Sequence, residues 1–372
     1  MDTRKFVETW RSGTMSRRTF EGGLAAAGLG LVTVPAVRRP AHAAGEVTYF
    51  GWSGYEAEGF HTAYTEKYGG SPEAAFWATE EEALQKMRQG FTPDVMHPCT
   101  YTLHKWRDAG VLMALDPDRL AWLPDMFESL NDVAGAVHDG IRYFMPMDWG
   151  NSTVLYRSDI VAPEHAGENL SWAIIYEDWY KGRVATYDTE ANVQIAGLLL
   201  GYDDIFNLTD EQLLSTRPLL EKQRENLRFY WGDVSEIDQA LASGELVAAY
   251  GWNDSYVRLR AQGVPIELGI PKEGIFTWLC GLTIHPGTKD IDAAYDLVNA
   301  MTSPEAGAFE IENFGFGHAN KKAFDLVSDD ALADLGLSTP EALLSNGIFF
   351  AAMDGQIEEK YIRLFDEVKA GF

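Results

Sequence analysis

The sequence predicts an α/β protein, because short apolar segments alternate with helical patterns along the chain after residue 45. Its 372 residues are enough for two domains of roughly 150 residues each. Hydrophobic residues make up 46% of the chain, which is ordinary for a globular protein and excludes a disordered or collagen-like chain. We therefore expect a large α/β fold with two domains.

Each expected strand and helix has a local signal. Residues 47–52 read as an apolar strand, and residues 58–68 as the helix after it. Thr79 is expected to cap the next helix. The first turn of that helix is rich in glutamate, and acidic side chains are favourable at the positive end of the helix dipole. Further strands are expected at 93–96, 154–156, 246–250, 266–270 and 279–284, and further helices at 292–301 and from Ser303.

Residues 1–43 are expected to direct export and to be removed. Residues 16–20 hold an Arg pair, a weakly apolar stretch rich in Ala and Gly follows at 22–37, and residues 41–43 fit a small-x-small cleavage site. A cytosolic amphipathic helix, the alternative, would need a 3.6-residue apolar stripe that this segment lacks. The segment resembles a twin-arginine signal and is too short to cross a bilayer, so we expect a soluble protein in the periplasm.

Charge and cysteine content exclude several classes of protein. The chain carries 56 Asp and Glu against 30 Lys and Arg, a formal net charge of −26. Nucleic acid and anionic lipid both attract clustered basic residues, so neither is an expected partner. Two cysteines are too few for a disulfide scaffold or a Cys-rich zinc module. The negative field favours a cationic ligand, although solubility alone would also explain it.

Aromatic residues recur where the expected strands stop. They are Trp52, Tyr101, Trp149, Trp252 and Trp278. Ligands of open α/β sheets bind outside the carboxyl ends of the strands, so these rings are placed to line one cleft. Any single tryptophan would otherwise be taken as a core residue. Their repetition beside Gly, Asn and Ser favours the shared cleft, because core strands are usually flanked by aliphatic residues.

An exported enzyme is the main alternative from another functional class. The sequence holds no Gly-x-Ser-x-Gly, His-Glu-x-x-His or Gly-x-Gly-x-x-Gly motif. The histidines are scattered, and His97 and His104 have Pro98 between them, which disfavours a metal pair. We therefore expect a binding protein with no catalytic residues, no metal and no cofactor.

Cys99 and Cys280 both fall at expected strand ends near the cleft. Two small buried residues are the favoured interpretation, because unpaired cysteine is among the most buried residue types. In an oxidising compartment the two would instead form a disulfide if their Cα atoms lay within about 7 Å of each other.

Five short stretches follow one another with a specific order and spacing: residues 49–55, 94–101, 145–150, 249–253 and 270–278. Together they resemble the periplasmic spermidine/putrescine-binding proteins of ABC importers, and the resemblance covers nearly all of the chain after the export segment. It implies a type II periplasmic binding protein fold, in which two α/β lobes hold a ligand cleft between them.

The resemblance also implies how the chain divides and which partners it has. One lobe is expected from residues 46–150 and 279–325, and the other from residues 151–278 and 326–372. Such a receptor is a monomer that closes its lobes around a small solute. It then delivers the solute to the permease of an ABC transporter in the inner membrane.

Several residues match the ligand contacts of that family. A diamine has an apolar stem and ammonium ends, so aromatic walls and carboxylates suit it. The resemblance implies aromatic contacts at Trp52, Tyr55, Tyr101, Trp252 and Trp278. It also implies small polar contacts at Ser53 and Cys99, and an amine-binding carboxylate at Asp188. Trp149 joins these candidates because it stands at a strand end.

Other positions depart from the family. The place of a second amine-binding carboxylate holds Ala191, and the place of a third holds Cys280, which stays among the candidate contacts. Phe350 replaces a polar amide, and the side chain of Glu190 is expected to point elsewhere. Asp148 is an acid that the family usually lacks. It would either relocate a cation site or bond to backbone where the lobes cross.

The expected ligand is a small organic cation: a polyamine, a short diamine or another amine. Because amine-binding acids are missing, a compact ligand with one or two cationic groups is favoured over a long polyamine. A quaternary amine would use tryptophan faces alone. The alternative is a zwitterion or a carboxylate, which would need an Arg or backbone donors. Arg157 follows a strand, but nothing in the sequence directs it to the cleft.

Overall fold

The computed structural model describes residues 47–371 except 132, 339–340, 342–343 and 345–346, so the expected export segment lies outside the described residues. The first part of the chain forms short strands and helices that end in one long strand. They are β1 (Thr48–Gly51), α3 (Thr62–Tyr68), β2 (Glu73–Phe76), α4 (Glu80–Arg88), β3 (Val95–Met96), α5 (Leu103–Asp108), α6 (Glu128–Asn131), β4 (Val137–His138), β5 (Ile141–Arg142) and β6 (Met145–Arg157).

The middle of the chain forms a second group of elements. They are α7 (Ala173–Tyr176), β7 (Val184–Tyr187), α8 (Ala191–Leu199), α9 (Asp210–Asn226), β8 (Leu227–Trp231), α10 (Val234–Ser243), β9 (Ala248–Trp252), α11 (Asn253–Ala261) and β10 (Ile266–Leu268).

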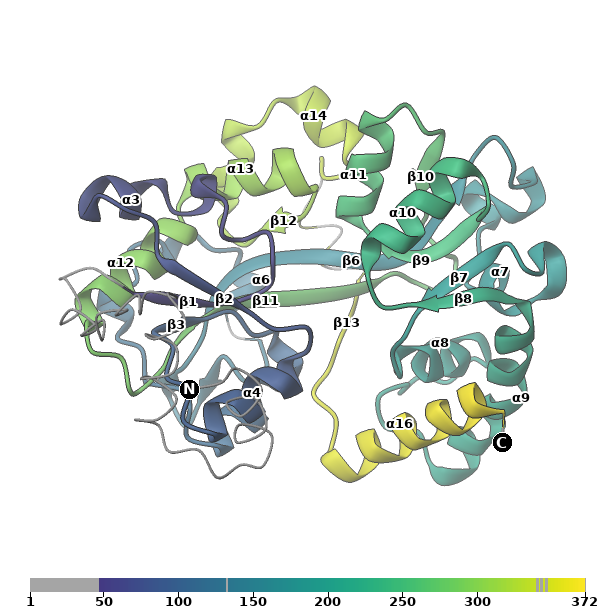
Figure 1. The fold of residues 1–372 in the computed structure, drawn as a ribbon, viewed down its shortest axis with the longest axis horizontal. Helices are drawn as coiled ribbons and strands as arrows, with labels where there is room; N and C mark the ends of the chain where they lie inside the picture. The colour runs from purple at the N-terminus through teal and green to yellow at the C-terminus, as the bar shows by residue number, and fades with distance from the viewer. Residues whose placement is uncertain (1–46, 132, 339–340, 342–343, 345–346, 372) are drawn as a thin grey trace, which may run out of the picture. The chain divides into compact units, whose positions relative to one another are not determined.

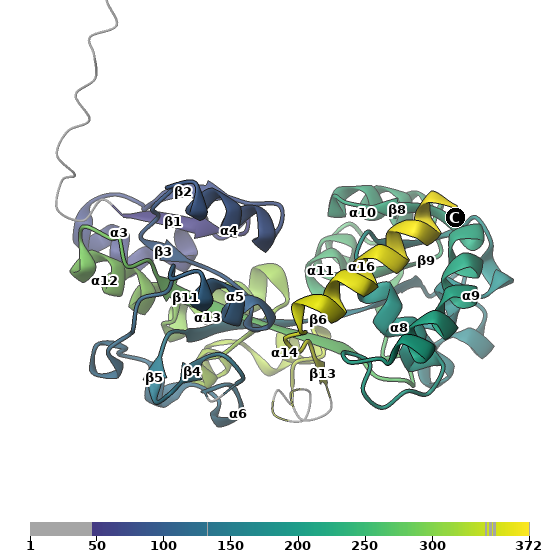
Figure 2. The same ribbon diagram turned by 90° about the horizontal axis from the view of Figure 1, so that it is seen from below.

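The last part of the chain returns to the first group of elements and then crosses to the second group. Its elements are β11 (Phe276–Ile284), α12 (Ile291–Met301), α13 (Pro304–Phe314), β12 (Gly317–His318), α14 (Asp329–Asp334), β13 (Ile348–Phe349) and α16 (Gly355–Ala370). Helix α16 packs against α8 and α9 of the second group (Figure 2).

The long strands β6 and β11 pair antiparallel in the middle of the sheet. The strand order is β2-β1-β3-β11-β6-β9-β7-β8, with β10 and β12 also on β6 and β13 on β11. Figure 1 shows β6 and β11 running side by side from the first group of elements to the second. The α/β fold class expected from the alternating pattern is confirmed by this order of strands and helices.

Local signals account for several element boundaries. Oγ1 of Thr79 accepts a hydrogen bond from the backbone N–H of Glu82 at 3.2 Å, which confirms the expected cap of α4. Ser303 caps α13 in the same way. The helix expected over residues 58–68 is divided, because His61 has non-helical backbone angles (φ −139°, ψ 30°) and separates a 3₁₀ turn from α3.

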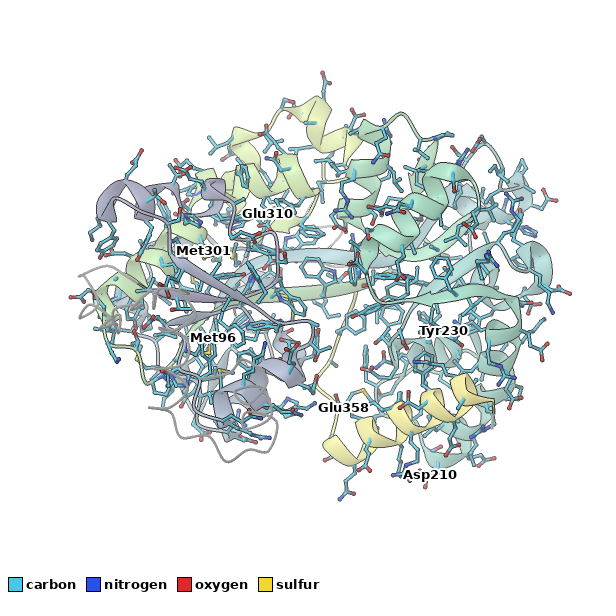
Figure 3. The ribbon with its side chains drawn as sticks, viewed as in Figure 1. Met96, Asp210, Tyr230, Met301, Glu310 and Glu358 are labelled. Carbon is cyan, nitrogen blue, oxygen red and sulfur yellow. A yellow bond between two sulfur atoms is a disulfide. The ribbon has the colours of Figure 1, made fainter. Side chains whose placement is uncertain are left out.

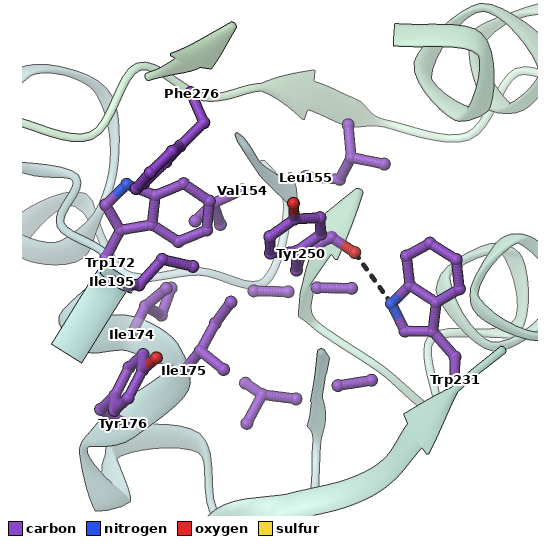
Figure 4. Close-up of a cluster of buried hydrophobic side chains, with 14 of the residues drawn as sticks. Val154, Leu155, Trp172, Ile174, Ile175, Tyr176, Ile195, Trp231, Tyr250 and Phe276 are labelled. Atoms are coloured by element: carbon purple, nitrogen blue, oxygen red, sulfur yellow. Dashed lines mark hydrogen bonds between the residues drawn. The ribbon is translucent and has the colours of Figure 1, made fainter. Parts of the chain in front are cut away.

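Two hydrophobic cores lie at the two ends of β6 and β11. The second core gathers buried residues between Val154 and Phe276 and between Met353 and Val368, and aromatic side chains such as Trp172 and Trp231 fill much of it (Figure 4). The first core consists of two clusters of buried residues, from 47–149 and 279–344.

We propose that these two cores mark the two lobes. The expected division assigned residues 326–372 to the second lobe, but Val327, Leu332 and Leu344 are buried in the first core. The change of side comes at β13, where Phe349 packs against the first core and Phe350 against the second. The proposed boundary therefore lies near residue 348 instead of 326.

Candidate functional site

Two predicted tryptophans flank one stretch of β6 from its two neighbouring strands. Gly150 and Ser152 point to the same face of this strand. Trp278 on β11 lies opposite Gly150, and Trp252 on β9 lies opposite Ser152. A Cβ atom at Gly150 would come within 2.3 Å of Cζ2 of Trp278, so the indole covers the strand there. Nε1 of Trp252 donates to Oγ of Ser152 at 3.1 Å. Both indoles are half-buried.

Trp149 has a core position instead. It points to the opposite face of β6, is 1% exposed and packs in the first core. Its Nε1 donates to the backbone oxygen of His318 at 3.3 Å, and its ring fills the space beside Gly317. Because the ring is covered and its donor is paired, we leave Trp149 out of the proposed site.

Tyr101 lies on a 3₁₀ turn that follows β3 and that a buried acid holds in place. Oε1 of Glu80 accepts a hydrogen bond from the backbone N–H of Cys99 at 2.6 Å and another from Oγ1 of Thr102 at 2.8 Å. Burial raises the pKa of Glu80 to about 7. The Tyr101 ring lies 5.9 Å from that of Phe350, so the turn reaches a side chain of the second core.

Cys99 and Cys280 form a disulfide, which corrects the favoured interpretation of two unpaired residues. They oppose each other in an isolated antiparallel bridge between the segment after β3 and β11, and this register brings the two side chains together. Each residue is 3% exposed. The bond ties the Tyr101 turn to the strand that carries Trp278, and it leaves neither cysteine a thiol to offer to a ligand.

Asp148 lies inside a chain of buried polar side chains. Its Oδ1 is 2.7 Å from Nε2 of His97, and its Oδ2 accepts a hydrogen bond from the Tyr55 hydroxyl. The same hydroxyl is 3.3 Å from Oε1 of Glu310, and the Tyr49 hydroxyl is 2.9 Å from Nδ1 of His97. Because an ionised carboxylate only accepts hydrogen bonds, Nε2 of His97 donates to Asp148. We call these five residues the buried network.

In the buried network, two carboxyl groups lie beside the same tyrosine hydroxyl, since Asp148 and Glu310 are both hydrogen-bond partners of Tyr55. Burial, and then the charge of Asp148, raises the pKa of Glu310 well above its usual range. Figure 3 shows Glu310 on α13 above β6. Both oxygens of Asp148 bond to side chains, Oδ1 to His97 and Oδ2 to Tyr55, instead of to backbone. A cation site at Asp148 stays a prediction. Tyr55, expected as an aromatic contact, is 5% exposed and bonded within the network.

Trp52 and Ser53 follow β1 and differ in exposure. Trp52 is half-buried, packs against both clusters of the first core, and lies 5.6 Å from the ring of Trp77. Its indole N–H is buried and has no hydrogen-bond partner among the described residues. Ser53 is exposed. The indole N–H of Trp52 is therefore available to a hydrogen-bond acceptor, while Ser53 faces solvent.

Tyr187 packs beside Trp252 and was not among the predicted site residues. The Tyr187 ring lies 5.2 Å from that of Trp252 in an edge-to-face arrangement and 4.6 Å from that of Trp231. Trp231 lies 5.0 Å from Trp252, is fully buried and donates from Nε1 to the backbone oxygen of Tyr250, as Figure 4 shows. The same sequence pattern that predicted Trp252 also fits Tyr187, which is an aromatic residue at the end of a strand.

The carboxylates near this strand end do not lie where they were expected. Asp188 forms an ion pair with Lys369 of α16, and its side chain is 40% exposed. The side chain of Glu190 is half-buried, and its charge contributes, after burial, to the raised pKa of Tyr187. Burial raises the pKa of Glu190, and among the described residues Glu190, unlike Asp188, has no basic partner.

The arrangement suits binding of a cation with an apolar stem. Aromatic faces at Trp252, Trp278 and Tyr101 attract positive charge and cover methylene groups. No group of three or more His, Cys, Asp and Glu within the described ranges is arranged to hold a metal ion.

Comparison with solved structures defines the class of fold. The chain has the type II fold of periplasmic binding proteins. A spermidine/putrescine ABC transporter substrate-binding protein of Streptococcus pneumoniae superposes with a TM-score of 0.74 at 20% identity, over 87% of this chain and 98% of that one. A periplasmic binding protein of Agrobacterium tumefaciens in complex with glucopine superposes with a TM-score of 0.69 at 18% identity, over 87% and 99%. The predicted type II fold is confirmed.

Comparison of sequences then shows the family. A model of the bacterial extracellular solute-binding proteins matches residues 62–335, and the chain belongs to that family. The spermidine/putrescine-binding periplasmic protein of Escherichia coli is 25% identical over 335 residues, covering 87% of this chain and 91% of the relative. The putrescine-binding periplasmic protein of the same organism is 24% identical, covering 97% and 98%. The predicted resemblance is confirmed. Within the described residues, no helix has the length and apolarity to span a membrane.

Proposed function

We propose that this chain is the solute receptor of an ABC importer and captures a small organic cation. One observation carries the ligand class: the half-buried indoles of Trp252 and Trp278 cover the same short stretch of one face of β6. Each well-placed aromatic face contributes about 2 kcal/mol to the binding of a desolvated cation. Relatives named for spermidine and putrescine binding support the same class.

The proposed mechanism of ligand binding depends on the two lobes that the two cores mark. The ligand lies in a cleft between the lobes, with Tyr101 on one side and Trp252 on the other, and closure excludes water from its charge. The contact of Tyr101 with Phe350 joins the turn after β3 to a side chain of the second core and supports this placement. The protein is exported by the twin-arginine pathway, acts in the periplasm as a monomer without catalysis, and passes its ligand to a membrane permease.

A thermal-shift screen of the purified protein tests the proposal. The panel holds putrescine, cadaverine, spermidine, choline, amino acids and organic acids, and any compound that binds only the folded state raises the melting temperature. We expect shifts with amines, followed by a measurable affinity in calorimetry. Shifts with carboxylates alone would reassign the site to the alternative ligand class. The absence of a shift with every amine would contradict the proposed function.

A further inference from the structure

Two acids that lie two residues apart at the end of β7 have opposite surroundings. Asp188 is paired with Lys369, whose ammonium also lies 5.7 Å from the Tyr230 ring and 5.3 Å from the Phe365 ring. Figure 3 shows Tyr230 on the same side of the molecule as α16. The cation beside Asp188 is thus held in place by its neighbours. Asp188 already has its positive partner and needs none from a ligand.

Glu190 has acids and hydroxyls around it. It is the residue before α8, and its Oε2 accepts a hydrogen bond from Oγ1 of Thr189 at 3.2 Å. The charged groups that act on it are Glu358 on α16 and Glu81 on α4, and both are acidic. Those two acids share Lys105, whose Nζ is 2.6 Å from Oε2 of Glu358 and 3.2 Å from Oε1 of Glu81. In the described part of the chain, no basic side chain forms an ion pair with Glu190.

Glu190 follows the strand end that carries one of the cleft aromatics, since Tyr187 is the last residue of β7 and its ring lies 5.2 Å from that of Trp252. After burial, its charge is the largest cause that raises the pKa of Tyr187, which contacts Trp252. It also contributes to the raised pKa of Tyr101, whose main causes are burial and Glu80. These electrostatic contributions agree with the position of Glu190 in the chain, directly before α8 and three residues after Tyr187 at the end of β7. A half-buried carboxylate without a cation is costly, because the lost hydration is not replaced.

We propose that Glu190, and not Asp188, is the carboxylate that binds the ammonium end of the ligand. The inference rests on the proposed function and names the residue that gives the site its selectivity. An ammonium with N–H groups donates charge-assisted hydrogen bonds to a carboxylate, whereas a quaternary ammonium has no proton to donate. The site therefore prefers primary and secondary amines to quaternary ones of similar size.

Calorimetry with putrescine and spermidine as probes tests the assignment with a matched pair of variants. Glu190→Gln and Asp188→Asn each remove one charge with almost no change in side-chain volume. Losing a charge-assisted hydrogen bond weakens binding by about 10- to 100-fold, so we expect that loss for Glu190→Gln. We expect a change of less than about threefold for Asp188→Asn, because its charge is balanced by Lys369. Thermal melts of both variants show whether either change affects folding.

The outcomes separate this inference from the proposed function. If the wild type binds a probe and Glu190→Gln binds it equally well, the assignment of Glu190 is overturned while the proposed function stands. A large loss confined to Asp188→Asn overturns it too and restores the residue expected from the sequence. If the wild type binds neither probe, both the proposed function and the assignment fall. Choline gives a further readout, because Glu190→Gln should weaken choline binding far less than putrescine binding.

Discussion

The two sides of the proposed cleft are held in place by different chemistry. On the first side, buried ionisable groups do the positioning: Glu80 holds the turn of Tyr101, and Asp148 fixes the strand beside it through the buried network. On the second side, the rings of Tyr187, Trp231 and Trp252 hold one another by aromatic contact.

Because of this difference, the two sides of the proposed cleft should respond differently to changes in pH and redox state. Hydrogen bonds of buried acids are directional and specify one arrangement, but burial raises the pKa of Glu80 and of Glu310, so folding depends on pH. Aromatic packing has no titratable partner at neutral pH and depends mainly on buried area. A change in pH or redox state should therefore disturb the first side, and ring truncation should disturb the second.

The largest expected effect is the loss of the disulfide on the first side. The bond joins residues 181 positions apart, and closing so long a loop in the unfolded chain stabilises the folded state by about 5 kcal/mol. We expect reductant to lower the free energy of unfolding, measured in urea, by about this amount. The double variant Cys99→Ala with Cys280→Ala is the control and should not respond to reductant. An equal response of the double variant would mean that the first side does not depend on the bond.

Removing Asp148 should cost about 3 kcal/mol, because Asp148→Ala leaves buried donors of His97 and Tyr55 without their acceptor. Ser152→Ala is the matched control on the same face of β6, and it should cost about 1 kcal/mol for one lost hydrogen bond. Urea unfolding measures both. Equal costs would show that the buried network does not hold the first side more firmly than a single hydrogen bond does.

The pH dependence of the first side should be visible at Glu80. Its pKa of about 7 exceeds the ordinary value of 4.5, so the folded state favours the protonated form. The stabilisation is therefore complete below about pH 4.5 and is lost as pH rises through 7, by about 3 kcal/mol in all. Glu80→Gln removes this titration and keeps an acceptor oxygen for the backbone of Cys99.

Unfolding of wild type and Glu80→Gln at pH 5 and pH 8 measures this effect. The wild type should lose stability between the two values, relative to the variant. Glu81→Gln, which removes an exposed charge from the same helical turn, is the control. A stability difference between wild type and Glu80→Gln that does not change with pH would contradict the role of Glu80.

Local signals in the sequence predicted much of the fold. The parts that the sequence did not predict depend on pairing between residues that are far apart in the chain. Thr79 and Ser303 mark helix starts because a cap involves neighbouring residues only. Strand β6 was expected only at residues 154–156, because the polar stretch 150–153 has the composition of a turn and is buried only through its partners β9 and β11.

The same limit applies to the site. The order of aromatic residues at strand ends predicted Trp252 and Trp278, but assigning Trp149 to the opposite face requires the full length of β6. Asp188 matched a family position by its neighbours in sequence, while its partner Lys369 lies 181 residues away. Glu190 could be recognised only after that pairing was known.

The smallest expected effect on stability, and the sharpest on binding, lies on the second side. Trp252→Ala removes a half-buried aromatic face and should weaken binding of an amine by about 2 kcal/mol, or about 30-fold. Trp149→Phe is the contrasting variant, because Trp149 is 1% exposed on the other face of the same sheet. It should lower the melting temperature and leave the affinity within about threefold of the wild type, since a core change without contact to the ligand acts on folding alone. Calorimetry of both variants at a temperature where both are folded compares the two. If Trp149→Phe lost affinity and Trp252→Ala retained it, the ligand would bind on the opposite face of β6, and the comparison between the two sides of the cleft would have to be rebuilt around Trp149.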